Sequence, residues 1–266
     1  MRRLLFFALL LLLTACSQIA EDERLIYVKQ PEVARRVLIE DFTGQRCVNC
    51  PMATEETEQL RKQYGHENVI VVGIHSGPLG FKGSATLVGL ATDEGDDYYS
   101  HWGVEYQPQG MVDREGGLLN YTAWSARVYE DIQKTSPVDI RQQCDYDAGT
   151  GEVVTTTTVT SLTGAVNAKL QLWVVEDSIT AMQLRYQEVG VPSSGQVTDR
   201  NYVHHHVFRQ SVNGHWGEDI RIDEGRQQNV VCRFTVAADW NPLQLWVVAF
   251  VYDATGVLQV TEAKVM

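Results

Sequence analysis

The sequence predicts an α/β domain followed by an all-β domain. Residues 37–39 and 69–74 are continuous apolar runs around a helical segment, as expected for parallel strands that are buried on both faces. After Pro137 the pattern changes to segments of alternating polarity separated by turn residues, which is typical of a β-sandwich. We therefore expect an α/β domain over residues 35–136 and a β-sandwich domain over residues 137–266.

The amino-terminal residues indicate a secreted lipoprotein. Two arginines precede an apolar run at residues 4–13, which is too short to span a bilayer and is typical of a signal peptide. The run ends in Leu-Thr-Ala-Cys, which resembles a bacterial lipobox. The resemblance implies a signal peptide at residues 1–15, acylation (palmitate included) of Cys16, and a lipidated tether over residues 16–34. An ordinary secretory signal followed by a chance cysteine is the alternative.

The expected location is the outer membrane. Ser17 stands where an inner-membrane retention signal would place aspartate. The lipid on Cys16 would hold the chain on either the periplasmic or the surface face. The formal net charge of −12 argues against nucleic acid as a partner.

Two cysteines follow the first strand in a C-x-x-C arrangement. Cys47 and Cys50 lie at the start of the helical segment, with Pro51 in its first turn. The helix dipole and the unpaired N–H groups there favour a thiolate. A strand–C-x-x-C–helix unit indicates a thioredoxin-like redox site, in which Cys47 attacks as the nucleophile and Cys50 resolves the mixed disulfide. The alternative is a Cys47–Cys50 disulfide that is only structural.

Two more residues strengthen the resemblance to the thioredoxin fold. Asp41 lies six residues before Cys47, where thioredoxins place a buried acid that accepts a proton. Pro108 precedes the third strand, where thioredoxins place a cis-proline that faces the disulfide. The resemblance implies that Asp41 manages protons and that Pro108 shapes the groove for the partner. The residues beside the cysteines differ from the thioredoxin pattern, so no redox potential is carried over.

Residues 137–266 are expected to form an immunoglobulin-like sandwich. The string Leu-Gln-Leu-Trp-Val-Val at residues 170–175 recurs at residues 243–248, which indicates either a duplication or two similar core strands. Cys144 and Cys232 lie in separate predicted strands. They are expected to form an inter-strand disulfide or to remain two buried thiols.

Three consecutive histidines are the remaining candidates for chemistry. On a strand, His204 and His206 would share one face and could ligate a metal, with His215 or an acid completing the site. The alternative is an edge strand whose histidines bond backbone or water. The C-x-x-C has no second pair at zinc spacing. We therefore expect no metal and no cofactor, with the histidine site as the alternative.

Several stretches together resemble the Bacteroidetes outer-membrane lipoprotein family of the twenty-eight-kilodalton type. The matching stretches are residues 40–44 with 47–51, Pro108 with residues 112–114, and residues 201–209 with 213–218. The resemblance implies a lipid-anchored envelope protein, in a family associated with surface binding.

Two functions are therefore expected. The first is thiol–disulfide exchange with envelope or surface proteins, which would make the chain an oxidoreductase. The second is a non-catalytic surface-binding or adhesion lipoprotein, in which the C-x-x-C only staples a loop.

Overall fold

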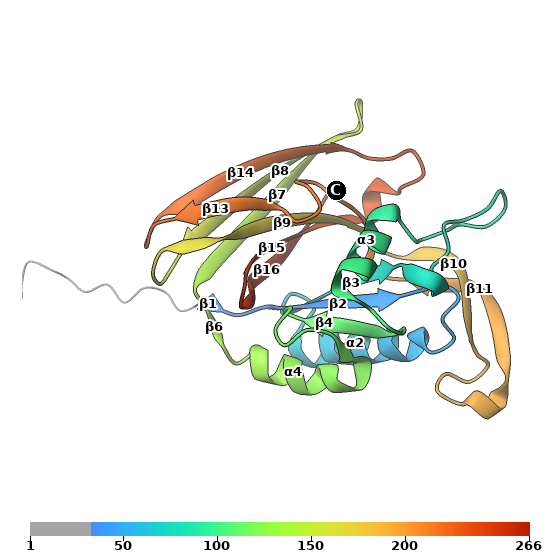
Figure 1. Cartoon of the computed structure of the whole chain (residues 1–266). Coiled ribbons are helices and arrows are strands. Elements are labelled where there is room, and N and C mark those ends of the chain that lie inside the picture. Colours follow the sequence, from blue (N-terminus) through green and yellow to red (C-terminus); the bar gives the residue numbers. More distant parts are fainter. Residues whose placement is uncertain (1–32) are drawn as a thin grey trace, which may run out of the picture. The chain divides into compact units, whose positions relative to one another are not determined.

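The computed structural model describes residues 33–266, which belong to one compact unit. The expected signal peptide, the lipidation site Cys16 and nearly all of the tether lie outside the described residues. In the first half of the described chain (Figure 1) the elements are β1 (Val33–Ala34), β2 (Val37–Thr43), α2 (Cys50–Tyr64), β3 (Val69–His75), η3 (Gly77–Leu79), α3 (Asp93–Trp102), β4 (Gln109–Val112), β5 (Leu119–Asn120), η4 (Tyr121–Ala123), α4 (Trp124–Asp131) and β6 (Thr135–Ser136).

The second half is almost entirely β-structure, as the alternating polarity predicts. Its elements are β7 (Val138–Asp147), β8 (Glu152–Ser161), β9 (Val166–Glu176), β10 (Ile179–Tyr186), η5 (Pro192–Ser194), β11 (Gln196–His204), β12 (Val207–Ser211), β13 (Glu218–Ile222), β14 (Gln227–Thr235), η6 (Pro242–Gln244), β15 (Leu245–Asp253) and β16 (Gly256–Lys264).

One nine-stranded sheet joins the two halves of the chain. Its order is β16-β15-β9-β12-β3-β2-β4-β5, with β13 also paired to β9. Strands β2 and β3 are parallel, and β12 from the second half adds to β3 in parallel, with Val207 opposite Gly73. Pro137 therefore marks the point where the part of the chain that contains helices gives way to the all-β part. Strands from both parts nevertheless belong to the same sheet.

The first two strands are buried on both faces, as their apolar runs predict. In β2, Val37 and Ile39 pack beneath α2 and α4 with Trp124. Leu38 and Phe42, which point to the opposite face of the strand, pack with aromatic and branched side chains of β9, β12, β15 and β16. The β-rich half thus covers one face of the α/β half.

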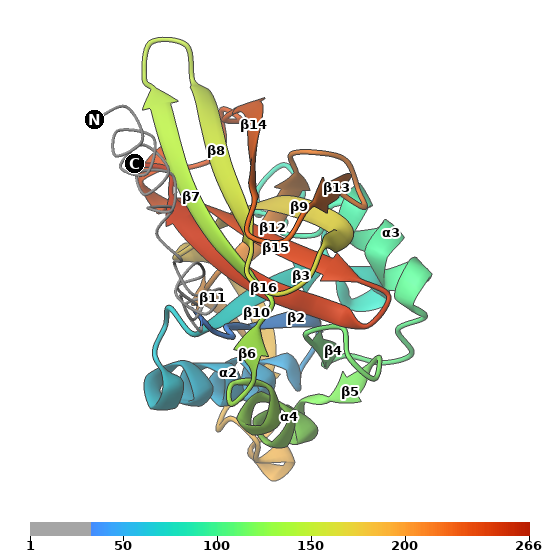
Figure 2. The ribbon, with the colours of Figure 1, turned by 90° about the vertical axis from the view of Figure 1, so that its left-hand side faces the viewer.

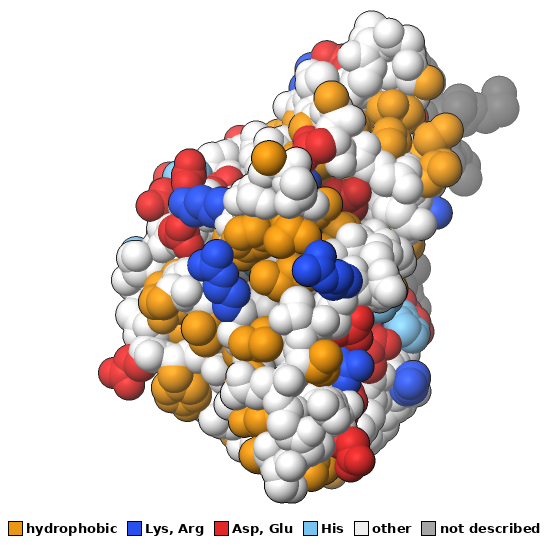
Figure 3. Space-filling model, turned by 90° about the vertical axis from the view of Figure 1, so that its right-hand side faces the viewer, with side chains coloured by type: hydrophobic (Ala, Val, Ile, Leu, Met, Phe, Trp, Pro, Cys, Tyr) orange, Lys and Arg blue, Asp and Glu red, His pale blue; other side chains and the backbone are white. Residues whose placement is uncertain are grey.

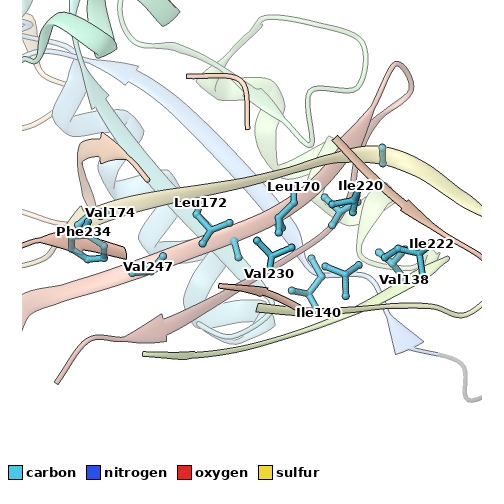
Figure 4. Packing of buried hydrophobic residues seen from close by; sticks show 14 of the residues in the cluster. Val138, Ile140, Leu170, Leu172, Val174, Ile220, Ile222, Val230, Phe234 and Val247 are labelled. Atoms are coloured by element: carbon cyan, nitrogen blue, oxygen red, sulfur yellow. The ribbon is translucent and has the colours of Figure 1, made fainter. Parts of the chain in front are cut away.

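A further core lies between two layers of β-structure. The three-stranded sheet β14-β8-β7 faces β9, β13 and β15, and β7 lies against β16 (Figure 2). The side chains that fill this space are short and branched or aromatic (Figure 4): Val138, Ile140, Leu170, Leu172, Val174, Ile220, Ile222, Val230, Phe234 and Val247. Sheet-on-sheet packing of this kind explains the alternation of polarity along the strands.

The repeated six-residue string lies on neighbouring strands. β9 and β15 are antiparallel, with Trp173 opposite Val248 and Val174 opposite Val247. All four side chains are fully buried. Two paired core strands with both faces covered account for the repeat.

Cys144 and Cys232 are free thiols rather than a disulfide. They lie on the two outer strands of the three-stranded sheet, and each pairs with Thr155 of the middle strand β8. A whole strand therefore separates them, which places their Cα atoms about 10 Å apart at the usual strand spacing. That distance is too long for a disulfide, so the structure has the two-thiol alternative.

Alkylation of the unfolded protein without reductant is expected to label Cys144 and Cys232 and to leave Cys47 and Cys50 unlabelled, because only the second pair is bonded. Peptide mass spectrometry measures this directly. A cross-linked peptide that contains Cys144 and Cys232 would contradict the structure.

A buried ion pair lies where the two halves meet. The guanidinium of Arg114 donates to both carboxylate oxygens of Glu40 in β2, with N···O distances of 2.7 and 2.9 Å. Four rings surround this guanidinium at centroid distances of 4.5–5.6 Å: Trp102, Trp173, Phe250 and Tyr252. The neighbouring Asp113 accepts a hydrogen bond from the amide of Leu38 at 2.8 Å. Residues 112–114, one of the stretches that resemble the lipoprotein family, therefore stabilise the contact between the two halves.

The stretch at residues 213–218 is structural as well. Asn213 accepts a hydrogen bond from the amide of Leu172 and donates one to the carbonyl of Leu170. Gly217 has φ +64°, and a Cβ there would lie 2.2 Å from the Leu170 carbonyl oxygen. These contacts hold β12 and β13 on the same strand, β9.

Candidate redox site

Cys47 and Cys50 form a disulfide at the start of α2. Cys50 is the first residue of the helix and Pro51 follows it. The loop that leads here from β2 packs closely on η3, because a Cβ on Gly44 would lie 2.4 Å from the carbonyl oxygen of Leu79. The same carbonyl accepts the amide of Arg46 at 3.0 Å.

The hairpin of β10 and β11 lies beside the start of α2 (Figure 1). Cys47 and Cys50 are only 1% and 2% exposed. The side-chain amide of Gln183 in β10 donates to the carbonyls of Cys47, at 2.8 Å, and of Gly44, at 3.2 Å. A strand of the β-rich half therefore closes over the C-x-x-C loop.

Further hydrogen bonds hold β10 along the loop. The amide of Leu184 donates to the carbonyl of Gln45 at 2.8 Å. The Gln45 side chain is fully buried and donates to the carbonyls of Met182 and Val88, while it accepts the amide of Leu90. Gln45 thus joins the hairpin, the C-x-x-C loop and the long loop before α3.

The surface on this side of the molecule carries hydrophobic side chains next to basic ones (Figure 3). Arg46, immediately before Cys47, is exposed. Its guanidinium carbon lies 4.9 Å from the ring centroid of Phe81. The positive charge of Arg46 is therefore on the surface, over an aromatic ring.

Asp41 and Cys50 line one small cavity of about 40 Å³. Asp41 is 5% exposed, and its Oδ1 atom has no hydrogen-bond partner among the described residues. Burial raises the pKa of this carboxyl to about 7, because an ionised group is costly away from water. The carboxyl can therefore gain or lose a proton near neutral pH.

Pro108 lies at the same end of the sheet as the C-x-x-C loop. It follows a cis peptide bond from Gln107 and directly precedes β4, whose Gln109 is paired with Phe42. The Gln107 side chain donates to the carbonyl of Thr43, at 2.6 Å, at the end of β2. Pro108 does not line the cavity that Asp41 and Cys50 share.

His204 and His206 do not lie on one continuous strand, although both are buried and line the same small cavity. β11 ends at His204, and His206 has φ +45°, which breaks the alternation of an extended strand. His206 contacts Glu262 at 3.2 Å, whereas the His204 ring packs on His75 at 5.0 Å between centroids. Over residues 33–266, no group of three or more His, Cys, Asp or Glu side chains could hold a metal ion.

Sequence reasoning misses His75, Gln183 and Tyr202. His75 ends β3, and carboxyl ends of parallel strands meet at one edge of a sheet, so its position after the second apolar run could have indicated the site. Gln183 and Tyr202 belong to the hairpin. No local pattern shows that this hairpin folds over the loop.

The fold and this site define an α/β protein with a covered C-x-x-C disulfide, continued by antiparallel β-sheets. A family model described as outer membrane protein Omp28 matches residues 95–266. The chain belongs to the Omp28 family of outer membrane lipoproteins, which confirms the location expected from its first residues. The match begins after Cys47 and Cys50, so membership does not bear on the disulfide.

One solved structure has a similar fold over most of the chain. HBP35 of Porphyromonas gingivalis is similar over 88% of this chain and 76% of that chain, with a TM-score of 0.64 and 14% identity. A domain of the outer membrane lipoprotein Omp28 from Porphyromonas gingivalis matches 49% of this chain and 88% of that one, with a TM-score of 0.34 and 20% identity. No curated protein matches the chain. Within residues 33–266, no helix has the length and apolar character to cross a membrane.

Proposed function

We propose that the α/β half is thioredoxin-like and that Cys47 and Cys50 exchange thiols and disulfides with envelope or surface proteins. The observation that carries the proposal is the cavity shared by Cys50 and the buried Asp41. A disulfide that only staples a loop needs no buried acid beside it, and burying such an acid lowers stability. The β-rich, immunoglobulin-like half would supply the cover of the site.

A partner dithiol supplies the electrons and protons that reduce the Cys47–Cys50 disulfide. A partner thiolate attacks Sγ of Cys47, the Cys47–Cys50 bond breaks, and Cys50 leaves with the electron pair and takes a proton from Asp41. The partner's second thiol, after losing its proton, attacks the partner sulfur of the mixed disulfide and releases Cys47. Two electrons and two protons of the dithiol thus reach the cysteine pair. The reverse reaction reduces a partner disulfide.

A partner thiolate reaches Cys47 only when the hairpin moves, because Cys47 is 1% exposed. β10 occupies the edge of the C-x-x-C loop and bonds to its carbonyls through Gln183. An extended partner segment that replaced β10 there would meet the same carbonyls. We therefore include opening of the hairpin as the first step of the exchange.

Gln183→Ala is expected to make reduction of the disulfide by dithiothreitol several-fold faster, because it removes two hydrogen bonds that hold the hairpin over the loop. Stopped alkylation followed by mass spectrometry measures the rate. Gln187→Ala, at an exposed position of the same hairpin, is the matched control. Equal rates in the two variants would remove the hairpin from the mechanism.

A Cys50→Ala variant tests the exchange itself. Its remaining Cys47 is expected to hold partner proteins as mixed disulfides that a reductant releases, whereas Cys47→Ala should hold none. The reduced wild-type protein should also reduce insulin. The exchange is refuted if dithiothreitol does not reduce the Cys47–Cys50 disulfide in the folded wild-type protein and the reduced protein does not reduce insulin.

The second candidate is a non-catalytic surface-binding lipoprotein whose disulfide only staples residues 47–50. The burial of both cysteines favours it. In that case a Cys47→Ser/Cys50→Ser variant keeps full binding on intact cells, and no mixed disulfide forms with Cys50→Ala.

A further inference from the structure

The small cavity beside the disulfide is lined from both halves of the chain. Asp41 of β2, Cys50 of α2 and His75 of β3 contribute from the α/β half, and Tyr202 and His204 of β11 contribute from the hairpin. Its volume of about 40 Å³ is enough for water, which needs roughly 10–15 Å³ of such space per molecule. The cavity is therefore a polar space directly behind the C-x-x-C.

Three buried polar atoms around this cavity have no hydrogen-bond partner in the described chain: Asp41 Oδ1, His75 Nδ1 and His204 Nε2. Their residues are only 4–5% exposed. Buried polar atoms are nearly always hydrogen-bonded to protein or ordered water, and cavity water can bridge such atoms. These three atoms can thus be connected through one cavity.

The rings of His75 and His204 pack against each other beside the cavity. Their ring centroids are 5.0 Å apart with the planes at 72°. Burial lowers the pKa of His75 and lowers that of His204 to about 4, so both imidazoles are neutral at pH 7. A neutral imidazole has one donor and one acceptor nitrogen, and it can accept a proton on one side while it releases one on the other.

The cavity is next to an open groove. Four residues line both spaces: Thr54, Glu58, Tyr202 and His205. The side chain of His205 is 39% exposed. A proton that enters from solvent at this groove has only a short distance to cross to reach His204.

We propose that His75 and His204 are positioning residues that carry protons between solvent and Asp41, through this cavity, during exchange at Cys47 and Cys50. The inference rests on the proposed exchange and adds the route of its protons. When Asp41 gives its proton to the leaving Cys50 thiolate, the histidine pair passes one proton from the groove to the Asp41 carboxylate. In the reverse reaction one proton travels outward.

Several other titratable or charged groups lie near His75 and His204 and can also affect how the reduction rate depends on pH. Those that line the cavity or act on the pair electrostatically are Asp41 from β2, Cys50, Glu58 and Arg61 from α2, Tyr202 from β11, His205 and His206 from the following turn, and Arg209 from β12.

The test is the rate of disulfide reduction by dithiothreitol between pH 5 and 9, with the full chain. His204→Gln keeps a donor and an acceptor but cannot pass a proton. We expect about a tenfold lower rate at pH 7, a larger solvent deuterium effect, and an unchanged equilibrium reduction potential. His75→Gln should behave alike, and the double variant should be no slower than either single one. His66→Gln, at an exposed position, is the control and should match wild type.

The following results would contradict the proton route through His75 and His204. A His204→Gln rate profile equal to that of wild type overturns the proton route and leaves the exchange intact. A faster rate, or a change of potential that accounts for the change of rate, means that His204 only packs the hairpin, which also overturns it. A wild-type disulfide that dithiothreitol cannot reduce in the folded protein refutes the exchange and the route together.

Discussion

Asp41→Asn is expected to stabilise the protein by about 4 kcal/mol at pH 8 and hardly at all at pH 4. Burial raises the pKa of Asp41 from 3.8 to about 7. Between those values the unfolded chain has released this proton while the folded protein keeps it. Stability from this group is therefore complete below about pH 4 and is lost as the pH rises through 7, by about 1.4 kcal/mol per unit of pKa difference. Asparagine has no charge to bury and avoids the loss.

Urea unfolding at pH 4, 6 and 8 measures the effect. Asp223→Asn is the control, because this carboxylate is exposed and the substitution should change stability equally at each pH. If Asp41→Asn gives the same change at pH 4 and pH 8, the carboxyl is ionised in the folded protein and it cannot supply the proton to Cys50.

Glu40→Gln is expected to lower the free energy of unfolding by about 3–5 kcal/mol, since removal of one partner leaves the other charge buried without compensation. The side chains of Arg114 and Glu40 are only 3% and 1% exposed. The guanidinium is confined by aromatic rings from both halves of the chain, so it cannot turn to solvent. The variant should therefore loosen the contact between the halves.

A double-mutant cycle separates the pair from its surroundings. Glu40→Gln/Arg114→Met removes both charges and should be more stable than Glu40→Gln alone, because the methionine suits the aromatic surroundings. Lys169→Met breaks an exposed pair with Asp219 and should hardly change stability. Additive effects of Glu40→Gln and Arg114→Met would contradict a direct interaction.

Local patterns predict the chemistry-bearing end of the α/β half well. The apolar runs become β2 and β3, Pro51 lies in the first turn of α2, and Cys47 and Cys50 are bonded. These features depend on strand burial, helix capping and a short sequence separation, which neighbouring residues control.

Contacts between distant residues are not predicted in the same way. The sequence proposes His204 and His206 as a pair, but His206 has φ +45° and His204 meets His75 instead. Cys144 and Cys232 lie in strands, as expected, yet β8 separates them. A break in the backbone decides where the histidines lie, and the order of the strands decides how far apart the cysteines are. The spacing of histidines or cysteines along the sequence predicts neither.

The sequence by itself determined that a strand, a C-x-x-C and a helix follow one another, and that the chain belongs with outer membrane lipoproteins. Only the tertiary structure decided that the β10–β11 hairpin covers the disulfide and brings His204 to the cavity of Asp41. Short-range order follows from local conformational preference and burial pattern. The docking of the hairpin follows from hydrogen bonds and packing between residues more than a hundred positions apart, which become visible only when the whole core is assembled.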